Sequence, residues 1–166
     1  MIKKFLLILF FVFGFSQICI SASTDDGSSK VSTNYDKAKK LIIKAKKLDE
    51  KGKTEKALKR YKKALKYLLK SNQEKPLQAD TLNYLGFTSR KLGDYEKGEK
   101  YYLLGLKIDP KHKGINEYLG ELYVATNRID LAKKRLEVLV NCNCEEYGEL
   151  KEIIDKKYWV KFTHLI

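Results

Sequence analysis

The most informative stretch of the chain is ADTLNYLGFTSRKLGDYEKGEKYYLLGLKIDPKH, residues 79–112, because the next 34 residues, KGINEYLGELYVATNRIDLAKKRLEVLVNCNCEE at 113–146, repeat its pattern. Both stretches place the triplet Tyr-Leu-Gly at the same offset, at 84–86 and at 118–120. A fixed spacing of this length is typical of repeat proteins, in which each unit is one supersecondary element that packs on its neighbours. The period therefore predicts a stacked array of similar units.

If each unit is a pair of packed helices, the small and aromatic residues within 79–112 have a clear packing role. Gly86, Gly98 and Gly105 let two helix backbones approach where a larger side chain would hold them apart. Leu85 and Tyr102 fill the seam between the two helices. We therefore expect Gly86 to lie directly against a neighbouring helix.

The middle and the end of the stretch carry the signals of a turn and of a helix end. Gly93 and Asp94 predict the turn between the two helices, with Asp94 as the N-cap of the second. Pro110 has no N–H with which to continue a helix, so the second helix ends before it.

This arrangement resembles the tetratricopeptide repeat (TPR), an antiparallel helix pair of 34 residues. The residues of 79–112 that match its preferred positions are Leu85, Gly86, Gly98, Tyr102, Gly105 and Pro110, and Ser89 departs from the pattern. Those of 113–146 are Leu119, Gly120, Tyr123, Ala132 and Leu136, and Leu139 and Cys144 depart. Departures are expected in a last repeat, because no further repeat packs beyond it.

A weaker copy lies upstream, at about residues 38–72. Alignment of Gly52 with the turn glycine of the next unit places a small, an aromatic and a second small residue at the matching positions, Ala57, Tyr61 and Ala64. This copy is seven residues longer than the others. Two extra turns extending its second helix to about Ser71 would keep that helix in phase, and a flexible loop is the alternative.

The segment after the repeats, at about 145–158, predicts a capping helix with an apolar stripe of Leu150, Ile153 and Ile154. The apolar tail that begins at Trp159 either packs on the core or docks on a partner. The expected fold of residues 35–166 is therefore all-α, a TPR-like α-solenoid of about three antiparallel helix pairs with a C-terminal capping helix.

The N-terminus has the order of a secretory signal: two lysines within Met1–Lys4, an apolar run over Phe5–Phe15, and small residues around Ala22. We expect a signal peptide at 1–22, a flexible linker at 23–34, and a periplasmic or secreted mature protein. A retained membrane anchor and lipidation at Cys19 are the alternatives. The segment CNCEEYGEL after the last repeat is similar to segments of exported bacterial tetratricopeptide proteins.

Positive charge is concentrated in the first helix pair. Residues 37–75 hold 16 basic and 4 acidic side chains, whereas residues 76–166 hold 15 and 14. This basic patch is either a solvated surface or a site for an acidic protein, an anionic lipid or a cell-wall polymer. Nucleic acid is not expected, because only 4 of the 34 basic residues are Arg. The patch comprises Lys56, Lys59, Arg60, Lys62, Lys63 and Lys66.

The resemblance also implies a binding site. In the family, side chains at set positions of each first helix line a concave groove that binds peptides or proteins. The resemblance implies that the groove of this chain is lined by Lys39, Lys46, Asn83, Phe87, Arg90, Lys91, Glu117 and Glu121. The full lysine-containing set that holds a peptide carboxylate in some members is lacking, since Ile42 stands at one of its places. Phe87 is either an exposed peptide anchor or packs against the N-terminal repeat.

The sequence predicts no catalysis. Cys142 and Cys144 could form a disulfide, stay reduced, or bind a metal or another chain. Neither His112 nor His164 has the spacing of a metal ligand or of a catalytic triad, and no phosphate-binding loop occurs. We therefore expect a non-enzymatic interaction module or scaffold of the bacterial cell envelope, without cofactor or metal. Its partner would be a peptide or protein, or an anionic envelope component, with membrane contact only through the export signal or at the periphery.

Overall fold

The computed structural model describes the backbone of residues 32–163 and the side chains of residues 32–157. The predicted signal peptide at 1–22 and most of the linker at 23–34 lie outside the described residues, as do the side chains of the apolar tail from Trp159 onward.

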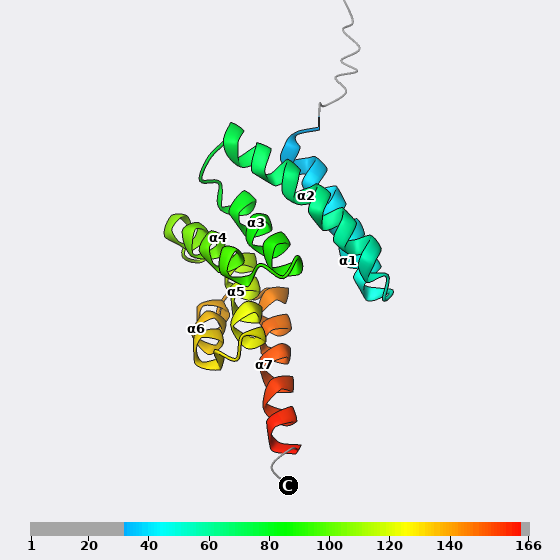
Figure 1. The fold of residues 1–166 in the computed structure, drawn as a ribbon. Coiled ribbons are helices and arrows are strands. Elements are labelled where there is room, and N and C mark those ends of the chain that lie inside the picture. The colour runs from blue at the N-terminus through cyan, green and yellow to red at the C-terminus, as the bar shows by residue number, and fades with distance from the viewer. Residues whose placement is uncertain (1–31, 164–166) are drawn as a thin grey trace, which may run out of the picture. The chain divides into compact units, whose positions relative to one another are not determined.

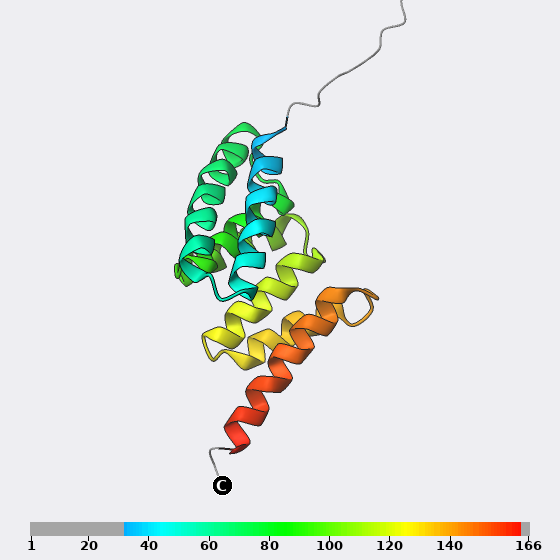
Figure 2. The ribbon, with the colours of Figure 1, turned by 90° about the vertical axis from the view of Figure 1, so that its right-hand side faces the viewer.

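Seven helices make up the described part of the chain: α1 (Asn34–Glu50), α2 (Thr54–Glu74), α3 (Ala79–Lys91), α4 (Tyr95–Ile108), α5 (Lys113–Ala125), α6 (Ile129–Leu139) and α7 (Glu145–Thr163). They form three pairs, α1 with α2, α3 with α4 and α5 with α6, and α7 packs on α5 and α6 (Figure 1; Figure 2). The expected all-α repeat fold is confirmed. The last helix runs to Thr163, past the predicted end at 158.

Each pair reverses direction at a residue with positive φ. Gly52 and Gly93 have φ of 67° and 90°, and Asn127 takes the matching place in the third pair with φ of 62°. Glycine and, less readily, asparagine tolerate this left-handed conformation. Asp94 caps α4, as the sequence predicts, because its side chain accepts a hydrogen bond from the Lys97 N–H at 3.0 Å.

The seven additional residues of the first unit extend a helix. α2 has 21 residues and runs without a break to Glu74, whereas its counterpart α4 has 14. Two whole turns leave the buried face of α2 in phase, so Leu68 and Ser71 remain buried beyond Ala64. None of the described helices has an apolar stretch long enough to cross a membrane.

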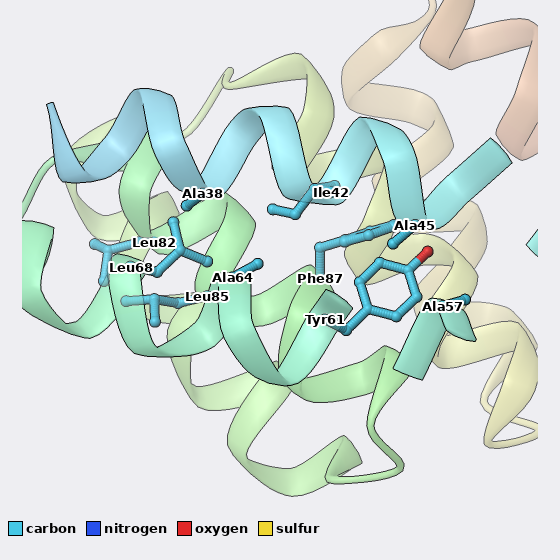
Figure 3. Packing of buried hydrophobic residues seen from close by; sticks show 10 residues of the cluster. All are labelled: Ala38, Ile42, Ala45, Ala57, Tyr61, Ala64, Leu68, Leu82, Leu85 and Phe87. Atoms are coloured by element: carbon cyan, nitrogen blue, oxygen red, sulfur yellow. The ribbon is translucent and has the colours of Figure 1, made fainter. Parts of the chain in front are cut away.

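The core of the first half joins the first pair to α3. Four alanines of α1 and α2, together with Ile42, Tyr61 and Leu68, pack against three larger side chains of α3 (Figure 3). All ten residues of this cluster are at most 2% exposed. They are Ala38, Ile42, Ala45, Ala57, Tyr61, Ala64, Leu68, Leu82, Leu85 and Phe87.

The glycines predicted to permit close packing do lie against neighbouring helices. A Cβ atom on Gly86 would come within 3.0 Å of ring carbons of Tyr102 in α4. A Cβ on Gly120 would lie 2.5 Å from Leu150 Cδ2, so the capping helix packs over this residue of α5. Leu150 and Ile154 are buried there, as their stripe predicts.

Candidate functional site

The first helices of the three pairs, α1, α3 and α5, bring charged and aromatic side chains into mutual contact. We call this set the A-helix cluster; it comprises Lys46, Asp49, Phe87, Arg90, Lys91, Tyr118 and Glu121. Five of its members were predicted groove residues, so sequence positions assigned to one groove do meet in space. The cluster joins residues that are as much as 75 positions apart, from Lys46 to Glu121.

Phe87 is the centre of the A-helix cluster and is not an exposed anchor. Its side chain is 2% exposed. The ring of Tyr61 lies edge-on to it with centroids 5.8 Å apart, and the ring of Tyr118 lies 4.9 Å away. The peptide-anchor hypothesis for Phe87 is therefore wrong, and the alternative of packing against the N-terminal repeat is correct. A tyrosine from each flanking unit covers the apolar surface that one helix alone would expose.

Three cations surround these rings. Lys46 Nζ lies 5.9 Å from the Phe87 centroid and 5.8 Å from that of Tyr118. The guanidinium of Arg90 lies at 5.6 and 5.8 Å from the same two centroids, and Lys91 Nζ lies 5.9 Å from Phe87. Cations at this distance are attracted to the negative face of an aromatic ring. The two rings therefore help to position the three cationic side chains around the cluster.

Ion pairs and a hydrogen bond tie the three helices together. Arg90 pairs with Glu121 at 2.6 Å, which links α3 to α5. Lys91 pairs with Asp49 at 3.3 Å, and the Tyr61 hydroxyl donates to the same carboxylate at 2.9 Å. Burial, followed by this hydrogen bond, raises the pKa of Tyr61, so the hydroxyl remains a donor. The side chains of the cluster are thus fixed before any partner arrives.

Asn83 and Glu117, two further predicted groove residues, are buried and do not offer a binding surface. They are 7% and 3% exposed. Burial raises the pKa of Glu117 to about 10, and a hydrogen bond with Glu149 and the charge of Glu121 act in the same direction. The raised pKa favours the protonated, neutral form of Glu117 at neutral pH. Glu149 belongs to the capping helix α7, which packs on α5.

The accessible part of the face consists of half-buried tyrosines and exposed lysines. Tyr35 and Tyr84 have ring centroids 5.8 Å apart, and Tyr118 is likewise half-buried. Lys46 is exposed and its ammonium lies 3.5 Å from the Tyr118 hydroxyl. Lys39 is also exposed. In the sequence, Tyr84 and Tyr118 served only to align the two repeats and were not predicted to bind a partner. Their identical offset in the two repeats was the signal that they lie on the same face.

The predicted basic patch lies on α2, away from the A-helix cluster. All six predicted residues are exposed. Four of them, together with Tyr67 and Lys70, line an open hollow of about 490 Å³ on this helix. These four are Lys59, Lys62, Lys63 and Lys66.

A disulfide joins Cys142 to Cys144 in the segment between α6 and α7. This is the first of the three alternatives for the pair. Within the described residues no group of three or more His, Cys, Asp or Glu side chains could hold a metal ion.

Two family models match overlapping parts of the chain. Residues 79–112 match the tetratricopeptide repeat model, which confirms the resemblance for this unit. Residues 35–85, which span α1, α2 and half of α3, match the MIT (microtubule interacting and transport) domain. One solved structure with a similar fold is the first TPR of Spaghetti (RPAP3) bound to the HSP90 peptide SRMEEVD. It has 21% identity and a TM-score of 0.46, and the match covers 76% of this chain and 97% of that one. No curated protein sequence matches.

Proposed function

We propose that this protein is a non-enzymatic interaction module that binds a peptide or protein on the face formed by α1, α3 and α5. The observation that carries the proposal is the row of half-buried tyrosines, Tyr35, Tyr84 and Tyr118, beside the exposed Lys46. Tyrosine and arginine are the residues that most often dominate protein interfaces, because they bury a large area at a small entropic cost. The family match at 79–112 supports an interaction role.

The same face indicates the chemistry of the partner. Arg90 and Lys91 already have acidic partners, whereas Lys46 and Lys39 have no ion pair within the described residues. A partner segment with aromatic or aliphatic groups would cover the tyrosines, and an acidic group would pair with Lys46. Because the cluster beneath is held by ion pairs and cation–π contacts, binding requires little reordering of the protein.

Site-specific photo-cross-linking tests this assignment. A photoreactive phenylalanine analogue at Tyr84 should give a defined adduct in cells, which mass spectrometry then identifies. The matched control is Tyr95, which is 43% exposed on α4 and lies outside the face. With the purified partner, Lys46→Glu should weaken binding by about 1–2 kcal/mol. Equal adducts from Tyr84 and Tyr95, or unchanged affinity of Lys46→Glu, would refute the proposal.

We further propose that the protein is exported to the periplasm or secreted after cleavage of residues 1–22, as in exported bacterial tetratricopeptide proteins. The order of charged, apolar and small residues at 1–23 supports this. N-terminal sequencing of the mature form should find a start within Ala22–Thr24. Recovery of intact Met1 on a membrane-embedded protein would contradict it.

The basic patch of α2 supports a second candidate function, association with an anionic component of the cell envelope. The specific observation is that none of its six residues has an ion-pair partner among the described residues. High salt should abolish this association, because exposed charges are screened, and should affect peptide binding on the α1–α3–α5 face much less.

A further inference from the structure

The lysines of α2 form a single row directly opposite its buried face. Residues 59, 62, 63, 66 and 70 recur at the three- and four-residue spacing of one helix face. The buried residues of the same helix, Ala57, Tyr61, Ala64 and Leu68, fall on the opposite side. With a rise of 1.5 Å per residue, the row is about 16 Å long. It therefore faces away from the core and does not overlap the tyrosines of α1, α3 and α5.

The charges in this row are not neutralised locally. The only acidic residues of α2 are Glu55 and Glu74, at its two ends. No ion pair within the described part of the chain involves any of the five lysines. Five unpaired ammonium groups on one face give a positive potential that extends about one Debye length into solvent.

The hollow along this row of lysines is open on one side, so it suits contact with a broad, flat surface better than the binding of a compact ligand. All six of its lining residues belong to α2, so no second element walls it. Tyr67 lies half-buried within it, and Lys37 of α1 places its ammonium 6.0 Å from the Tyr67 ring, which carries the positive charge across to the neighbouring helix. A compact ligand would have contacts on one side only, whereas a charged plane would contact every lysine of the row at once.

We propose that this face of α2 binds the surface of an anionic lipid bilayer. The inference rests on the second candidate function and names its partner; it is independent of peptide binding. Lysine is a compact, strongly hydrated charge on a flexible stem, which suits a fluid array of headgroups, whereas carboxylate recognition in proteins favours the fork of Arg. Lysine is also depleted from protein interfaces. Clusters of four to eight basic residues on a helix are the pattern that anionic membranes attract.

Vesicle co-sedimentation of the full chain tests the proposal. The vesicles are phosphatidylcholine with or without phosphatidylglycerol. The test variant carries Lys59→Gln, Lys62→Gln, Lys63→Gln and Lys66→Gln. The matched control has the same net charge and carries Lys97→Gln, Lys107→Gln, Lys111→Gln and Lys134→Gln, four exposed lysines outside α2. Circular dichroism establishes that both variants keep the helical content and melting temperature of the parent.

The α2 variant should bind phosphatidylglycerol vesicles at least about tenfold more weakly than the parent, while the control stays within about twofold. Equal losses in both variants would mean that net charge alone acts and would overturn the proposal. Polyglutamate serves as an acidic-protein probe: loss of polyglutamate binding by the α2 variant with vesicle binding unchanged would also overturn it. Cross-linking from Tyr84 reports separately on peptide binding, so failure of one function is distinguishable from failure of the other.

Discussion

Where α3 meets α4, glycine brings the helices together; where α1 meets α2, alanine does. Gly86 lies against the ring of Tyr102, and a Cβ on Gly98 would lie 3.1 Å from the Gly86 carbonyl oxygen. In the first pair Ala57 and Ala64 take the places of the α4 glycines, and both are fully buried. The comparison teaches that alanine serves at the crossing of the first pair where glycine serves at that of the second. At Gly86 the Tyr102 ring lies so close that a Cβ would collide with it.

The two pairs that differ in this way also lie in matches to two different family models. The second pair has helices of 13 and 14 residues with glycine crossings and matches the tetratricopeptide repeat. The first pair has helices of 17 and 21 residues with alanine crossings and lies within the MIT match. Similar antiparallel packing thus arises from two local sequence patterns.

Gly86→Leu should have the largest effect, because it breaks the glycine crossing. The new side chain would collide with the fully buried Tyr102 ring, and overpacking of this kind costs about 1–3 kcal/mol. Urea denaturation measures the loss. Gly148→Leu is the control, since a Cβ there meets nothing within 4 Å. Equal, negligible shifts at both positions would show that the crossing has been misassigned.

Ala64→Gly sharpens the comparison by installing glycine in the alanine crossing. It removes a buried methyl group and adds the cost of glycine within a helix, together about 1–2 kcal/mol. The reciprocal Gly105→Ala should change stability by less than about 1 kcal/mol, because the gain in helix propensity offsets a shift of the Ile115 side-chain end. Equal effects of the two changes would mean that the crossings are interchangeable.

Glu117→Gln tests the contact between the third pair and the capping helix. There Glu117 of α5 lies beside Glu149 of α7. The folded-state pKa of Glu117 is about 10, above its ordinary 4.5, so the folded state binds the extra proton between these values. The parent should therefore lose stability as pH rises from about 4.5 toward 10.

Glutamine stays neutral throughout this range. Glu117→Gln should match the parent near pH 4 and exceed it in stability at pH 7, with the gap widening up to pH 10. Thermal melting at a series of pH values measures this. A gap that is constant with pH would argue that Glu117 is not the group that titrates.

Tyr61→Phe should have the smallest effect. It removes the hydroxyl that donates to Asp49 at 2.9 Å but keeps the ring that packs on Phe87. The cost should be about 0.5–1 kcal/mol, because Asp49 retains Lys91 as a partner. Chemical denaturation of the single and double variants with Lys91→Ala measures the coupling. Strict additivity would mean that the two contacts with Asp49 are independent.

The helix pairs could be predicted from the sequence, but which side chains the assembled pairs bury and which they expose could not. Tyr-Leu-Gly, the crossing glycines and the phase of α2 are local signals, and the structure bears them out. The burial of Phe87 depends on Tyr61 and Tyr118, which come from other units, so no spacing within α3 could reveal it. The raised pKa of Glu117 depends in part on Glu149 of α7, a helix that lies outside the repeat pattern.

The contact between Gly120 and Leu150 sets the length of the array. Gly120 is the third-pair counterpart of Gly86, but the side chain that covers it comes from the capping helix. With Leu150 seated there, a further unit cannot stack after α6 unless α7 is first displaced. A designer who wants a longer protein should therefore insert the new repeat between Pro110 and Lys113, in the segment that joins the second helix pair to the third. This insertion leaves the packing of α7 on α5 unchanged.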